Sequence, residues 1–64
     1  MTRNPIRMAR IVAEVTGDTV RASDGAILAD PVHLSLAARA HLAANGWVPT
    51  GSEREFDVFT HVTA

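Results

Sequence analysis

The stretch DPVHLSLAARAHLAANG, residues 30–46, predicts the element around which the rest of the fold is arranged. Asp30 is a residue type that caps helix N-termini, and Pro31 suits the first helical position, where a missing N–H costs nothing. Asn45 and Gly46 favour the left-handed conformation that ends many helices. We therefore expect one helix over residues 31–44.

This predicted helix is apolar on two sides. At about 100° per residue, two stripes fall on roughly opposite sides. The first contains Val32, Leu36, Ala40 and Ala43, and the second contains Leu34, Ala38 and Leu42. One helix on a small sheet buries a single stripe, so the other is covered by the C-terminal segment or by a partner. We expect Leu34, Ala38 and Leu42 to contribute to a partner-binding surface, with a second copy of the chain as one partner.

The residues before this helix predict a hairpin. Apolar residues alternate over residues 7–15, and Gly17-Asp18 is a pair that favours a two-residue turn. That turn would place Val15 opposite Val20. Residues 1–5 contain Pro5 and are expected to form a flexible arm.

A second turn is predicted at residues 24–25. It would pair Ala22 with Ile27 and create a short third strand, Ala26–Ala29. The same residues could instead form a loop leading into the helix.

Two strands are predicted after the helix, over residues 47–50 and 54–63, separated by a turn at residues 51–52. Pro49 cannot donate a ladder hydrogen bond, which places the first of them at a sheet edge. The predicted fold class is α+β: a small antiparallel sheet of four to five strands in the order β-β-(β)-α-β-β, with one helix packed across one face. We expect residues 1–64 to form a single domain.

Length and composition narrow the classes of protein. The chain has 64 residues, of which 47% are hydrophobic and 20% charged, as in globular rather than disordered proteins. A chain this short cannot enclose a deep catalytic site. The absence of cysteine excludes disulfides, thiolate metal sites and thiol catalysis. No apolar run approaches the roughly 20 residues of a membrane span, and the N-terminus lacks a signal-peptide core, so we expect a cytoplasmic protein without membrane contact.

The net charge of −1 is unevenly distributed. Residues 1–21 contain four arginines and two acids, whereas residues 22–64 contain two arginines and five acids. The basic part suggests an alternative function, weak nucleic-acid binding by an arginine-bearing hairpin and its arm. The residues concerned are Arg3, Arg7, Arg10 and Arg21.

The acidic part suggests a protein partner. Acidic and aromatic residues alternate near the C-terminus, a composition that suits a partner with a basic groove, such as a nucleic-acid-binding host protein. The predicted partner-binding residues here are Trp47, Glu53, Glu55, Asp57 and Phe59.

No residue constellation predicts catalysis, a metal or a cofactor. His33 and His41 are eight residues apart, about 12 Å along a helix, and cannot chelate one ion. His61 has no companion ligands that we can name. None of the serines lies in a recognisable nucleophile motif.

The passage LAANGWVPTGS, residues 42–52, resembles the helix, glycine, aromatic, strand and Gly-Ser passage of HicA-type toxins, small ribonucleases with a double-stranded-RNA-binding-like fold. In that family the catalytic histidine follows the Gly-Ser pair, and Glu53 occupies this position here. Two predicted strands also precede the helix with which the family begins. The resemblance therefore does not extend to the ribonuclease activity.

Together these features predict a small non-enzymatic protein-interaction module that inhibits or regulates another macromolecule, and that forms a homodimer. Stand-alone proteins of this size are commonly carried by mobile elements, as antitoxins or phage-encoded inhibitors of host defence.

Overall fold

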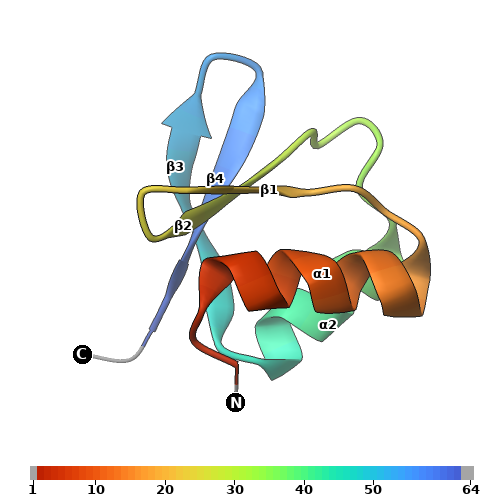
Figure 1. Cartoon of the computed structure of the whole chain (residues 1–64). Coiled ribbons are helices and arrows are strands. Elements are labelled where there is room, and N and C mark those ends of the chain that lie inside the picture. Colours follow the sequence, from red (N-terminus) through yellow and green to blue (C-terminus); the bar gives the residue numbers. More distant parts are fainter. Residues whose placement is uncertain (1, 63–64) are drawn as a thin grey trace.

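The computed structural model describes residues 2–62 (Figure 1). Its elements are α1 (Pro5–Thr16), β1 (Arg21–Ser23), β2 (Ala26–Ala29), α2 (Leu36–Ala44), β3 (Trp47–Glu53) and β4 (Phe56–His61). The strands form one antiparallel sheet in the order β1-β2-β4-β3. The predicted α+β class with a small antiparallel sheet is confirmed, but the element order is α-β-β-α-β-β and there are two helices rather than one.

Helix α1 replaces the predicted first strand, so the hairpin expected over residues 7–22 is wrong. The side chain of Asn4 accepts hydrogen bonds from the N–H groups of Ile6 at 2.9 Å and Arg7 at 3.3 Å, and Pro5 occupies the first turn. Gly17 ends the helix at φ 80°. Met8 and Val12, four residues apart, are the buried residues of α1, and this helical spacing outweighs the period-two alternation.

The segment before α1 is docked rather than free. The N–H of Thr2 donates to Asn45 Oδ1 at 3.3 Å, and Trp47 Nε1 donates to the carbonyl oxygen of Thr2 at 2.8 Å. The flexibility expected of this arm stays a prediction; the structure shows residue 2 in contact with Asn45 and Trp47, and Met1 lies outside the described residues.

The second predicted turn is confirmed. β1 and β2 pair across residues 24–25, with Ala22 opposite Ile27 and Arg21 opposite Leu28. Gly25 supplies a positive φ of 79° at this turn.

Helix α2 is shorter than expected because its cap is Ser35 rather than Asp30. The Ser35 hydroxyl accepts from the N–H of Ala38 at 3.1 Å, while Asp30 caps a separate turn by accepting from the N–H of Val32 at 3.0 Å. The predicted stop is confirmed, since α2 ends at Ala44, Asn45 is its C-cap and Gly46 has φ 84°.

The last two strands are longer than expected, and their turn lies at residues 54–55 instead of 51–52. β3 forms the edge that Pro49 predicted, and its register shifts by a bulge between Pro49 and Gly51.

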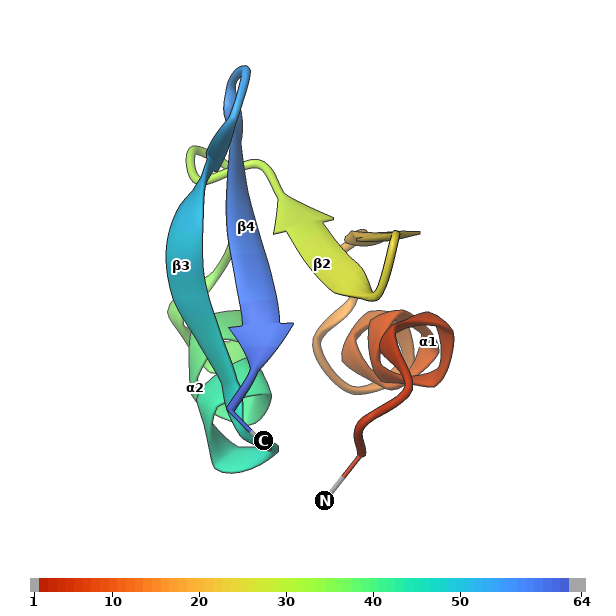
Figure 2. The same ribbon diagram turned by 90° about the vertical axis from the view of Figure 1, so that its left-hand side faces the viewer.

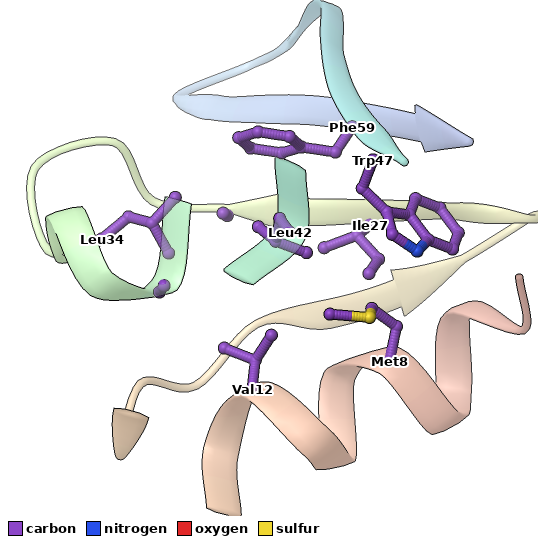
Figure 3. Close-up of a cluster of buried hydrophobic side chains, with 9 residues drawn as sticks. Met8, Val12, Ile27, Leu34, Leu42, Trp47 and Phe59 are labelled. Atoms are coloured by element: carbon purple, nitrogen blue, oxygen red, sulfur yellow. The ribbon is translucent and has the colours of Figure 1, made fainter. Parts of the chain in front are cut away.

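Both helices pack on the same face of the sheet (Figure 2). Ile27 pairs with Phe59, and both side chains enter a core that takes residues from α1 and α2 (Figure 3). This core contains Met8, Val12, Ile27, Ala29, Leu34, Ala38, Leu42, Trp47 and Phe59.

The expectation that Leu34, Ala38 and Leu42 lie on the surface is wrong, because each of them is at most 8% exposed. The other stripe faces solvent instead, with Leu36 83% exposed. Leu34, Ala38 and Leu42 join the common core with residues of the sheet and of α1, which removes their apolar area from water. Neither helix within residues 2–62 has the length and apolar character needed to cross a membrane.

Candidate interaction surface

The sheet face that points away from the helices carries apolar side chains that neither helix covers. Cross-strand partners share a face, and Leu28 pairs with Arg21 on one side and Val58 on the other. We call this surface the open face. Its residues are Arg21, Ser23, Ala26, Leu28, Val48, Gly51, Glu53, Phe56, Val58 and Thr60.

The centre of the open face is apolar and partly exposed. Leu28 is 8% exposed although it lies outside the core cluster, and Val48, Phe56 and Val58 around it are half-buried. The solvated face of an antiparallel sheet ordinarily carries polar residues, whereas the polar residues of this face surround an apolar centre. Apolar side chains that a fold leaves uncovered are candidates for a contact surface.

Charge is placed at the two ends of the open face. Arg21 lies on the β1 edge, and Glu53, opposite Phe56, lies on the β3 edge. Glu55 is exposed in the adjoining turn, beside Arg54. The open face therefore continues into a mainly acidic hairpin tip.

The predicted acidic and aromatic patch is only partly brought together. Glu53 and Glu55 accompany Phe56 at the hairpin tip. Trp47 and Phe59, at 1% and 3% exposure, belong to the core, and the expectation that they contact a partner from the surface is wrong. Asp57 pairs with Ser52 on the other face of β4 and is half-buried. The aromatic side chain available for contact is thus Phe56, whose alternation with Phe59 along β4 was visible in the sequence.

The edges of the sheet are poorly suited to strand addition. β1 has three residues, and β3 contains Pro49 and the adjoining bulge. Short edge strands, proline and bulges are features that prevent edge-to-edge pairing. Of the surfaces of the sheet, the open face is therefore better suited to a contact than either edge.

The arginines of the alternative function are divided between two surfaces. Arg3, Arg7 and Arg10 line hollows along α1, whereas Arg21 lies on the open face, on the other side of the sheet. The expectation of one arginine-bearing hairpin is therefore wrong, because residues 5–16 are helical.

A hollow of about 240 Å³ between the end of α1 and the start of α2 holds two carboxylates, and both accept hydrogen bonds from backbone N–H groups. Asp18 Oδ2 accepts from Ser35 Oγ at 2.6 Å and from the Ser35 N–H at 2.9 Å, and these bonds lower the pKa of Asp18. The hydrogen bond from His33 Nδ1 at 2.8 Å, with that from the Val32 N–H, lowers the pKa of Asp30. Ionised carboxylates held in this way stabilise the backbone and are poor proton donors.

The histidines are scattered. His33 is exposed beside Asp30, whereas His61 meets Trp47 edge to face with ring centroids 5.3 Å apart. Within residues 2–62 no three His, Cys, Asp or Glu side chains come together in a way that could hold a metal ion.

The chain matches no protein-family model, and comparisons with curated proteins and with solved structures found no significant match.

Proposed function

We propose that this protein is a small non-enzymatic interaction module that regulates or inhibits a partner protein by docking through its open face. The observation that carries the proposal is the apolar centre formed by Leu28, Val48, Phe56 and Val58, which both helices leave uncovered. A partner that covers this centre removes apolar area from water, which contributes about 25 cal/mol of hydrophobic free energy per Å² to binding.

The charges at the ends of the open face define the chemistry of the partner. Glu53 and Glu55 extend the apolar centre into an acidic tip, so the matching surface has an apolar patch bordered by basic side chains. Proteins that bind nucleic acids expose such basic surfaces, and covering one would block the nucleic acid from binding. Occlusion of this kind is how an antitoxin or a phage-encoded inhibitor of host defence would act.

The test is capture of a partner by the full chain, followed by reconstitution of the purified pair and measurement of its Kd. Val58→Lys places a charge at the centre of the open face and should weaken binding at least about tenfold, a change of roughly 1.4 kcal/mol. Leu36→Lys makes a similar change at an exposed position on α2 and should leave the Kd within about twofold. Circular dichroism confirms that both variants are folded.

Two outcomes contradict the proposal. One is an equal loss of binding in both variants, which would place the contact elsewhere. The other is a homodimer in sedimentation equilibrium that Val58→Lys dissociates, which would assign the open face to a second copy of the chain instead of a different protein.

A further inference from the structure

The exposed side of α1 and the segment before it carry three arginines on one continuous surface. A hollow of about 370 Å³ is lined by Thr2, Arg3, Asn4 and Arg7, and a neighbouring one of about 510 Å³ is lined by Asn4, Ile6, Arg7, Arg10, Ile11 and Glu14. The two hollows share Asn4 and Arg7, so they adjoin. We call Arg3, Arg7 and Arg10 the arginine surface.

The three side chains of the arginine surface form no ion pair within residues 2–62. Within residues 2–62 the ion pair present joins His33 to Asp30, and none of the three arginines reaches a carboxylate. Glu14 is the one acidic side chain lining either hollow. The acids of the β3–β4 turn lie at the far end of the molecule from α1 (Figure 1). Exposed guanidinium groups without carboxylate partners are free to bind an external anion.

We propose that the arginine surface binds the phosphate backbone of a nucleic-acid duplex. Arg7 and Arg10 are three residues apart on the helix, which places their Cβ atoms about 5–6 Å from each other, so their long side chains can reach neighbouring phosphates of one strand. Arg3 extends the same row beyond the N-cap of α1. Guanidinium groups bind phosphates through paired N–H donors, and this geometry can engage neighbouring phosphates.

A duplex fits this surface better than a single strand. Proteins that bind single strands ordinarily stack bases on aromatic side chains, and neither hollow is lined by an aromatic residue. The contacts available here are charge contacts, which read the backbone rather than the base sequence.

This binding is independent of the proposed protein docking. The arginine surface is on α1, whereas the open face is on the other side of the sheet from both helices. Each surface can therefore be occupied without the other, and failure of one proposal leaves the other standing.

The experiment is fluorescence anisotropy of the full chain with labelled duplex DNA, duplex RNA and the corresponding single strand. Three phosphate contacts predict a slope of log K against log salt of about −2.7, a loss of affinity of about 40-fold between 50 and 200 mM salt. Arg7→Gln should reduce the magnitude of this slope by about 0.9, and the triple change of Arg3, Arg7 and Arg10 to Gln should abolish binding at 50 mM salt.

Arg54→Gln is the matched control, because it removes the same charge at the opposite end of the molecule. It should change the affinity less than twofold, and both duplexes should bind more tightly than the single strand. The proposal is overturned by the absence of duplex binding at 50 mM salt, by tighter binding of the single strand, or by an equal effect of Arg54→Gln and Arg7→Gln.

Discussion

The two faces of the sheet are built from the same strands and have opposite environments. In β4, Phe59 is 3% exposed beneath the helices, whereas Phe56, three residues earlier, is half-buried on the open face. In β2, Ile27 enters the core cluster while its neighbour Leu28 lies outside it. Both faces have apolar residues at their centre, so residue type alone does not distinguish the face that the helices bury from the open face. The position of the helices does.

The largest difference in unfolding free energy is expected between alanine substitutions of Phe59 and of Phe56. Phe59→Ala removes a ring from the core and should cost about 3–5 kcal/mol of unfolding free energy, a large part of the stability of a small domain. Phe56→Ala should cost about 1 kcal/mol or less in the isolated chain, because its ring is already partly solvated, yet it should weaken partner binding. Urea unfolding followed by circular dichroism measures the stability of both variants.

Equal destabilisation by the two substitutions would contradict the distinction between the faces, because it would mean that Phe56 is also a core residue.

A smaller loss of unfolding free energy is expected at the end of α2, where Gly46 contacts His61. A Cβ added at Gly46 would lie 2.8 Å from His61 Nε2, and Gly46 also has φ 84°. Gly46→Ala should therefore cost at least about 2 kcal/mol, from backbone strain together with displacement of the His61 ring. Gly25→Ala is the control, since Gly25 has φ 79° but nothing within 4 Å of its added Cβ, and should cost about 1 kcal/mol. Similar melting temperatures for the two variants would show that the His61 contact is unimportant.

The smallest effect is expected at the contact between Asp18 and Ser35, which joins the end of α1 to the start of α2. Hydrogen bonds from Ser35 hold the pKa of Asp18 below its ordinary value of 3.8, so they stabilise the folded state while Asp18 is ionised. Between the folded and unfolded pKa values the unfolded chain binds more protons, and stability therefore falls as the pH drops below 3.8. Asp18→Asn should lose less stability than the wild type on acidification from pH 6 to pH 3.

The comparison is made by urea unfolding at both pH values. Asp30 has a lowered pKa as well, so the variant should retain part of the acid sensitivity. Ser35→Ala, which removes the hydroxyl donor, should reduce the loss in the same direction. If Asp18→Asn lost as much stability as the wild type between pH 6 and pH 3, the contact between Asp18 and Ser35 would not hold α2 against the end of α1.

The amino-acid sequence by itself determined the features that depend on neighbouring residues. Asp24-Gly25 specifies its turn and the register of Ala22 with Ile27, and Asn45-Gly46 specifies the end of α2. Pro49 assigns β3 to an edge. Each of these signals acts through local backbone conformation or a missing N–H donor, which requires no knowledge of the rest of the fold.

The tertiary structure decided what each apolar face contacts. Residues 5–16 carry both an alternating and a helical pattern, and the helix forms with Met8 and Val12 packed into the common core. Helix α1 therefore covers one face of the sheet together with α2, and the other face stays open. The stripe with Leu34 and Leu42 is consequently buried, although it is spaced like its opposite. Burial depends on elements distant in the chain, because hydrophobic stabilisation follows the area that they remove from water.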